Sequence, residues 1–369
     1  MEKACASALL EQAQAQKEPL FTGLFEILSV NSERGEAAPG APFGPGPRKA
    51  LEETMKLAAS LGFSTETVLD QVGIAKYEPA GTEGKPYIGI VGHLDVVPAE
   101  GDWTTPAYEP QIRDNRVYAR GALDNKGPIL SCLYALKAIR DSGMKLSRPV
   151  WIIFGTNEET GMEDIPTYLS VKEPPAAGFT PDCKYPVVYA ERGRSVYELT
   201  FADEEQAAAW CRRYPDEASL QLDIRDPEFG ILQLRNRKQE ENKVTFAASY
   251  PPSTDAGKIL KILEDSLPQH AQAKLVSDWK PVFFEKEGPL CASLKWAYES
   301  VTGLDGTPVT TTGGTYAKRM PNIVPFGPSF PGQKGIAHLP DEWMDVDDLM
   351  ANLKIYTLAI ADLATRELS

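Results

Sequence analysis

The sequence predicts an α/β protein of two domains, and three observations lead to this expectation. Two short apolar runs, 86–92 and 150–155, are bounded by turn residues as buried strands are. Helical stretches alternate with these runs, which is typical of a layered α/β domain with a mixed sheet. After Arg194 the pattern changes to short strands and two helices, which predicts a small α+β domain inserted into the first. The expected boundaries are 1–194 with 287–369 for the larger domain and 195–286 for the smaller one.

The helices expected in the larger domain follow from apolar residues at helical spacing and from turn residues at their ends. They cover 7–31, 48–61, 127–142, 290–301 and 346–365, the last beginning after Asp345. In the smaller domain alternating apolar residues predict strands and two helical patterns interrupt them. The strands are expected at 196–201, 219–223, 230–235, 243–248 and 273–279, and the helices at 204–212 and 254–266.

Composition excludes several classes of protein. With 38 Lys and Arg against 52 Asp and Glu the formal charge is −14, which disfavours a nucleic-acid partner. No run approaches the roughly 18 apolar residues of a membrane span, so no membrane partner is expected. The five cysteines are scattered and odd in number, which predicts neither a disulfide framework nor a cysteine metal site. Residues 1–18 lack the apolar stretch of a signal peptide, and we expect a cytoplasmic location.

Several polar loop segments carry residues capable of metal chemistry. Each has an ordinary interpretation when taken alone: Asp124 as a helix N-cap, adjacent glutamates as exposed charges, and His338 as a surface side chain. Two of the three histidines, however, lie in Gly- and Pro-bounded loops near carboxylates. Imidazole and carboxylate ligands without thiolate suit zinc, manganese or cobalt. The candidate residues are His93, Asp95, Asp124, Glu158, Glu159, Asp182 and His338.

These segments, in this order, resemble the M20 metallopeptidases and, within them, the PepV-like dipeptidases. The resemblance spans 41–193 and 310–343, most of the larger domain. It implies a phosphorylase/hydrolase-like catalytic domain and a ferredoxin-like lid domain, here shorter than usual. The segments that carry it are APFGPGP (41–47), GHLDVVP (92–98), GALDNKGP (121–128), NEETG (157–161), GFTPD (178–182), TGGTYAK (312–318) and FPGQKGIAH (330–338) with its PDEW tail.

The resemblance also implies roles for single residues. Two divalent ions, with zinc favoured over manganese and cobalt, would share Asp124 as a bridging ligand. Asp95 would orient His93, and Glu158 would be the general base. The peptide bond after the bridging aspartate, Asp124–Asn125, would be cis. The remaining ligands would be His93 and Asp182 for one ion and Glu159 and His338 for the other.

The expected reaction is hydrolysis of a dipeptide with a free amino terminus. The loop with Gly313, Gly314 and Thr315, together with Asn125, would bind the substrate. Two alternatives remain open at this point: a deacylase or other amidohydrolase acting on an N-acyl amino acid, and a non-catalytic metal-bearing protein that binds peptides. The oligomeric state is expected to be monomer or homodimer.

The inserted domain departs from the family pattern in two places. The lid histidine that polarises the scissile carbonyl in the family has no counterpart, because the third histidine, His270, reads as a surface residue. Ser249 stands where the family carries an arginine for the substrate carboxylate. The metal-binding half of the pattern is therefore intact, while the substrate-binding half is altered.

Overall fold

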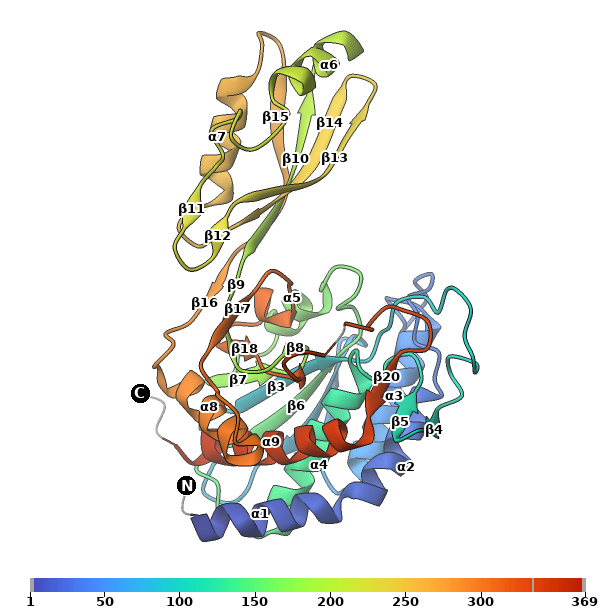
Figure 1. Cartoon of the computed structure of the whole chain (residues 1–369). Helices are drawn as coiled ribbons and strands as arrows, with labels where there is room; N and C mark the ends of the chain where they lie inside the picture. The colour runs from blue at the N-terminus through green and yellow to red at the C-terminus, as the bar shows by residue number, and fades with distance from the viewer. Residues whose placement is uncertain (1–2, 334, 367–369) are drawn as a thin grey trace. The chain divides into compact units, whose positions relative to one another are not determined.

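A computed structural model of the chain describes residues 3–333 and 335–366 and consists of two compact units (Figure 1). The smaller unit comprises Tyr189–Phe284 and the short segment Val309–Gly314. The larger unit comprises the chain up to Val188, Glu285–Pro308, and the chain from Thr315 onward.

The unit boundaries differ from the predicted 195–286, and the segment Val309–Gly314 was expected in the larger domain. The reason is a three-stranded sheet whose strands are far apart in the sequence. In it β9 (Val188–Glu191) lies between β16 (Val282–Phe283) and β17 (Val309–Thr311). Strands this short and this far apart in the sequence leave no local pattern that would assign them to one unit.

Six strands form the central sheet of the larger unit, in the order β1-β2-β6-β3-β7-β18. β6, β3, β7 and β18 run parallel, whereas β1 and β2 are antiparallel to their neighbours. The predicted α/β class with a mixed sheet is therefore confirmed, and the two apolar runs are β3 and β6. The bounds are Ser64–Val68 (β1), Val72–Tyr77 (β2), Val150–Gly155 (β6), Ile88–His93 (β3), Ala177–Thr180 (β7) and Ile323–Pro325 (β18).

Helices cover this sheet. α4 and α9 pack against each other and against β3, and α1 packs on both of them (Figure 1). Within the part of the chain that the structure describes, no helix is both long and apolar enough to cross a bilayer. The helices of the larger unit are Lys3–Ala15 (α1), Lys17–Leu28 (α2), Pro45–Ser60 (α3), Lys126–Asp141 (α4), Asp164–Leu169 (α5), Pro289–Thr302 (α8) and Val346–Thr365 (α9).

The single helix expected at 7–31 is wrong, because α1 ends at Ala15 and α2 starts at Lys17. Pro19 explains the break: a proline ring inside a helix clashes with the carbonyl four residues earlier, which is that of Ala15. The last helix, by contrast, has the predicted bounds of 346–365. Its Asp345 makes no side-chain cap bond and instead pairs with Arg116, Oδ1 to Nε, at 3.1 Å.

Short strands frame the loops of the larger unit. β5 (Arg116–Tyr118) pairs with β4 (Gln111–Arg113) on one side and with β20 (Trp343–Asp345) on the other. A second small pair joins β8 (Cys183–Lys184) to β19 (Pro328–Ser329). The β5–β20 pair places the loop that precedes α4 beside the loop that precedes α9.

The smaller unit has the element order strand-helix-strand-strand-helix-strand, with an antiparallel sheet in the order β13-β14-β10-β15. This is the order of a split βαβ, ferredoxin-like unit. A short hairpin, β11 (Arg225–Asp226) and β12 (Gly230–Ile231), precedes β13. The main elements are Gly193–Thr200 (β10), Glu204–Arg213 (α6), Gln233–Glu240 (β13), Lys243–Tyr250 (β14), Ala256–Ser266 (α7) and Gln272–Trp279 (β15).

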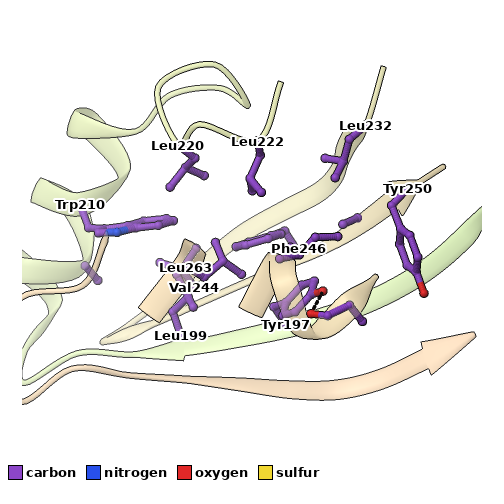
Figure 2. Close-up of a cluster of buried hydrophobic side chains, with 14 of the residues drawn as sticks. Tyr197, Leu199, Trp210, Leu220, Leu222, Leu232, Val244, Phe246, Tyr250 and Leu263 are labelled. Atoms are coloured by element: carbon purple, nitrogen blue, oxygen red, sulfur yellow. Dashed lines mark hydrogen bonds between the residues drawn. The ribbon is translucent and has the colours of Figure 1, made fainter. Parts of the chain in front are cut away.

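The strand expected at 219–223 is wrong, because this segment forms turns and irregular structure. Its alternating leucines, Leu220 and Leu222, are nevertheless buried in the core of the smaller unit, beside Trp210 and Phe246 (Figure 2). The alternation therefore reports which side chains are buried and not how the backbone is paired.

The core of the smaller unit can be tested with Phe246→Ala. Phe246 is 2 % exposed, and its ring lies 5.8 Å from that of Tyr197. Truncating a buried Phe costs about 3–5 kcal/mol, so the free energy of unfolding should fall by that amount in urea denaturation followed by circular dichroism. The control Val276→Ala removes a side chain that is 54 % exposed on β15 and should change it by less than about 0.5 kcal/mol. Equal losses in both variants would contradict the assignment of this core.

Candidate metal centre

The polar segments that stand out in the sequence meet at one edge of the central sheet. β6, β3 and β7 are adjacent and parallel, so their carboxyl ends lie at the same edge. His93 is the last residue of β3 and is paired with Gly155, the last residue of β6. Glu158 and Glu159 follow β6, and Asp182 follows β7. This is the edge at which α/β sheets commonly place their binding sites.

The carboxylate of Asp124 lies between two imidazoles. Its Oδ1 is 3.1 Å from Nε2 of His93, and its Oδ2 is 3.0 Å from Nε2 of His338. Nε2 of His338 is also 3.1 Å from Oε1 of Glu159, and Nε2 of His93 is 3.6 Å from Oδ2 of Asp182. Each oxygen of Asp124 thus faces a different group of candidate ligands, which is the arrangement that a bridging carboxylate needs.

Two overlapping groups of candidate metal ligands have atoms within 4.8 Å of one another, and both include His93. One group adds Asp124 and Glu159, and the other adds Glu158 and Asp182. The two groups therefore contain Glu158, to which the resemblance assigns proton transfer, together with four of the five predicted ligands; the fifth, His338, contacts Asp124 and Glu159.

The loop around Asp124 is held by its neighbour Asn125. The peptide bond between them is cis, as the resemblance implied, and α4 begins after Asn125, so Asp124 is not the N-cap. Asn125 is fully buried; its Oδ1 accepts the N–H of His93 at 3.2 Å, and its Nδ2 donates to the carbonyl of Pro181 at 2.6 Å. The expected contact of Asn125 with the substrate stays a prediction. A Cβ on Gly92 would lie 2.4 Å from Oδ1 of Asn125, which explains the glycine there.

Asp95 supports the site through the backbone of the glutamate loop. Its Oδ1 and Oδ2 accept the N–H groups of Glu158 and Glu159, each at 3.1 Å. Nδ1 of His93 lies 2.8 Å from the backbone carbonyl of Asp95 and 3.5 Å from its carboxylate. The carbonyl is therefore the closer partner of the imidazole, and the carboxylate positions the two glutamates.

Asp164, which the sequence does not single out, holds the same loop from its other end. Its Oδ2 accepts the N–H groups of Thr156 at 2.8 Å and Asn157 at 3.2 Å, and the hydroxyl of Tyr316 at 2.5 Å. Burial raises the pKa of Asp164 to about 6, although the hydrogen bond from Tyr316 acts in the opposite direction. The ring of Tyr316 meets that of His93 edge to face at 6.2 Å.

Burial governs the ionisation of the clustered groups. It raises the pKa of Glu158 well above its usual value, and the charge of Asp182 adds to this. The pKa of Asp182 is also raised by burial and then by the charge of Asp124. Burial disfavours the charged form of Asp124 too, but hydrogen bonds from the two imidazoles outweigh it and hold this pKa below its usual range. The hydrogen bonds of His338 raise its pKa to about 10.

This set of side chains fits divalent cations. Carboxylates outnumber imidazoles in the cluster, and buried carboxylates close together are unfavourable unless a proton or a cation offsets their charge. Imidazole nitrogen and carboxylate oxygen without thiolate are the ligands of catalytic zinc, manganese and cobalt sites. His338 adopts a φ of 67°, a backbone conformation that is uncommon outside glycine and is enriched at functional sites.

The loop predicted to bind the substrate terminus makes local contacts. The N–H of Gly313 donates to Oγ1 of Thr311 at 3.3 Å, and the hydroxyl of Thr315 accepts the N–H of Ala317 at 3.2 Å. The second contact caps the short 3-10 helix η1 (Tyr316–Lys318). Substrate binding by Gly313, Gly314 and Thr315 stays a prediction.

The smaller unit offers no histidine in the position that the family pattern requires. His270 lies after α7 and is exposed, as predicted. Ser249, at the family's arginine position, accepts a hydrogen bond from Nε of Arg192 at 3.0 Å, and its carbonyl accepts one from Nη2 at 2.6 Å. Nη2 of Arg192 also donates to the carbonyl of Ile231 at 2.8 Å. This guanidinium is thus bonded within its own unit.

Comparison with known sequences identifies the family. Residues 89–362, which run from β3 to α9 and include every candidate ligand, match Peptidase family M20/M25/M40. Because the match covers far more than half of the chain, this protein belongs to that family of metallopeptidases, which are hydrolases.

Relatives are similar over nearly their whole lengths. "Putative dipeptidase YtjP" of Bacillus subtilis is 28 % identical, over 95 % of this chain and 98 % of the relative. "Putative dipeptidase SAB1611c" of Staphylococcus aureus is 24 % identical, over 97 % and 99 %. The first alignment spans 461 positions, whereas this chain has 369 residues, so the relative contains segments with no counterpart here.

Solved structures show the same fold. The dipeptidase Dug1p of Saccharomyces cerevisiae superposes with a TM-score of 0.71 at 14 % identity, over 97 % of this chain and 98 % of that one. The aminopeptidase PepT of Bacillus cereus gives 0.70 at 16 % identity, over 95 % and 99 %. The YXEP protein of Bacillus subtilis, described as a dinuclear metal binding peptidase, gives 0.63 at 15 % identity, over 95 % and 100 %.

The support that Asp95 gives to the glutamate loop can be tested with Asp95→Asn. An asparagine can accept one of the two amide N–H groups, but its NH₂ would face the other. We expect affinity for zinc, measured by competition with a chelator, to fall about 10–100-fold, as is typical when a partner of a metal ligand is lost. Asp102→Asn removes an exposed carboxylate from the following loop and should leave the affinity unchanged. Equal affinities in the two variants would show that Asp95 does not support the site.

Proposed function

We propose that this protein hydrolyses the peptide bond of a small substrate, a dipeptide with a free amino terminus. The observation that carries the proposal is the carboxylate of Asp124 between His93 and His338, with Glu158 in the same cluster. The relatives named dipeptidases, similar from end to end, support the substrate class.

In this proposal the cluster holds two divalent ions. His93, Asp124 and Asp182 hold one, and Asp124, Glu159 and His338 hold the other; zinc is favoured, and manganese and cobalt fit the same ligands. When bound, the ions supply an acidified water molecule and polarise the scissile carbonyl. Asp95 positions the two glutamates through its carboxylate and His93 through its backbone carbonyl.

Glu158 acts as the general base. Its carboxylate accepts a proton from the attacking water as the new C–O bond forms. It then returns this proton to the nitrogen of the leaving amine as the C–N bond breaks. Burial raises the pKa of Glu158, whereas cations bound beside it would favour the charged form that accepts the proton.

Two alternative functions are suggested by the residues of the smaller unit. Ser249 stands at the family's arginine position and His270 is exposed, so neither substrate-binding group of the family's lid has its usual residue. A non-catalytic metal-bearing protein that binds peptides would need neither group. A deacylase for N-acyl amino acids would keep the metal centre and the hydrolytic chemistry but use other substrate contacts.

Further properties belong to the same proposal. The cytoplasmic location expected from the sequence is kept as part of the proposal; none of the five cysteines, all within the described residues, forms a disulfide. We keep the smaller unit as the proposed lid. We also propose that this lid is shorter than is usual for dipeptidases, a proposal supported by the segments of the Bacillus subtilis relative that have no counterpart in this chain. Monomer and homodimer both remain compatible with the proposal.

The decisive experiment is turnover of a dipeptide library and an N-acyl amino acid library by protein reloaded with zinc, manganese or cobalt, with the metal content per chain measured in parallel. Hydrolysis of dipeptides with two ions per chain supports the proposal. Hydrolysis confined to N-acyl amino acids would replace it by the deacylase. Two ions per chain without turnover of either library would favour the binding protein.

The role of Glu158 can be separated from metal binding with Glu158→Gln. The amide cannot take up a proton at neutral pH, so turnover should fall by about 10²–10⁴-fold while both ions are retained. The matched control is Glu159→Gln, one residue along the same loop, which should lose affinity for the ion beside His338. Full activity of Glu158→Gln with its normal metal content would exclude Glu158 as the base.

A further inference from the structure

A buried glutamate outside the predicted ligand set contacts the loop of the bridging aspartate. Glu342 is 0 % exposed, and its Oε1 accepts the N–H groups of Leu123 at 2.8 Å and Asp124 at 3.0 Å. Its Oε2 accepts the N–H of Gly121 at 3.2 Å and a hydrogen bond from Nη1 of Arg120 at 2.7 Å. Both oxygens of this carboxylate are therefore used to fix the backbone that carries Asp124.

Arg120 extends the same contacts to two more segments of the site. It is 1 % exposed; its Nη1 also lies 3.4 Å from the carbonyl of Leu339, and its Nη2 donates to the carbonyl of Pro98 at 3.3 Å. Leu339 follows His338, and Pro98 ends the segment that begins with His93. One buried ion pair thus joins the three segments that contribute His93, Asp124 and His338.

Backbone pairing between two short strands fixes the position of Glu342 relative to Arg120. β20 pairs with β5 in register, Trp343 opposite Tyr118, and the N–H of Ala119 donates to the carbonyl of Glu342 at 3.1 Å. The loop of His338 is thereby fixed against the loop of Asp124 at a point four residues beyond His338. The side chain of Glu342 then only has to span the short distance to the amides of the neighbouring loop.

We infer that Arg120 and Glu342 form a positioning pair, which sets the carboxylate of Asp124 between His93 and His338 and so determines how tightly the metal centre binds its ions. This inference rests on the proposed function, because it assigns Asp124 as the bridging ligand. Fully buried ion pairs contribute little net stability, since the cost of removing two charges from water offsets their attraction. Groups that hold metal ligands in place, in contrast, typically change affinity or activity about 10–100-fold when they are lost.

The test measures zinc affinity by chelator competition in two variants of Glu342 and one control variant, each in the full chain. Glu342→Gln keeps the shape but presents an NH₂ where Oε2 now accepts two donors, and we expect about 10-fold weaker binding. Glu342→Ala removes all four contacts, and we expect about 100-fold weaker binding. In the cobalt-loaded protein the visible absorption spectrum of both variants should differ from that of the unchanged chain, because the ligand geometry has shifted.

The matched control is Asp362→Asn, which alters another buried carboxylate of the larger unit. Asp362 accepts a hydrogen bond from Ser293 at 2.5 Å and pairs with Arg366 at 2.9 Å. The N–H of Ser147, just before β6, donates to the carbonyl of Ala364, two residues after Asp362. Asp362 therefore lies near the start of β6, whereas Glu158 follows the end of this strand. This variant should bind zinc with unchanged affinity, whatever its effect on Tm.

Two results would overturn the inference. One is unchanged zinc affinity and an unchanged cobalt spectrum in a folded Glu342→Gln, which would make the pair a structural contact only. The other is an equal loss of affinity in Asp362→Asn, which would make the effect one of general stability. Failure of the proposed function is a separate result: tight binding of two ions without hydrolysis of any substrate counts against the dipeptidase, whereas the role of Glu342 is read from metal affinity alone.

Discussion

The burial of several carboxylates beside two imidazoles is the constraint on which the larger unit depends. Burial and neighbouring acids raise the pKa values of Glu158 and Asp182, whereas hydrogen bonds from both imidazoles lower the pKa of Asp124 despite its burial. Such a cluster is unfavourable in a folded protein unless protons or cations offset its charge. The three parallel strands β6, β3 and β7 bring its members together at their carboxyl ends. By bringing these carboxylates together, the sheet creates a site that favours the binding of cations.

Several buried side chains outside the ligand set hold this cluster in shape. Asp95, Asp164 and Glu342 each use carboxylate oxygens to accept backbone N–H groups of the loops that carry the candidate ligands. Asn125 does the same with its amide, joining the backbone of His93 to that of Pro181. Loops are usually the mobile parts of a fold, and here acceptors anchored on other elements immobilise them. The positions of the candidate ligands thus depend on residues outside the ligand set.

The two units of the chain match the family pattern to different degrees. The larger unit brings the candidate ligands together. In the smaller unit Ser249 stands at the family's arginine position and accepts a hydrogen bond from Arg192, and His270 is an exposed residue with no match to the family's lid histidine. The chemistry of activating water resides in the metal centre, while the choice of substrate resides in the groups around it. A peptidase of this kind can therefore keep its reaction while its substrate range changes.

The sequence by itself predicted the α/β class, the strands β3 and β6 and the bounds of α9, and it singled out the candidate ligands that the structure brings together. These are properties of short segments: apolar periodicity, helix-ending residues, and imidazole or carboxylate in Gly-bounded loops. Where local signals competed, as at Pro19 within 7–31 or in the buried leucines of 219–223, the pattern predicted the wrong element. Only the tertiary structure decided that Asp95 holds the glutamate loop, that Val309–Gly314 belongs with the smaller unit, and that Glu342 binds the amide of Leu123, 219 positions away. The physical reason is that these contacts depend on which distant segments the sheet order brings together, and that order is not written in the local pattern of any one segment.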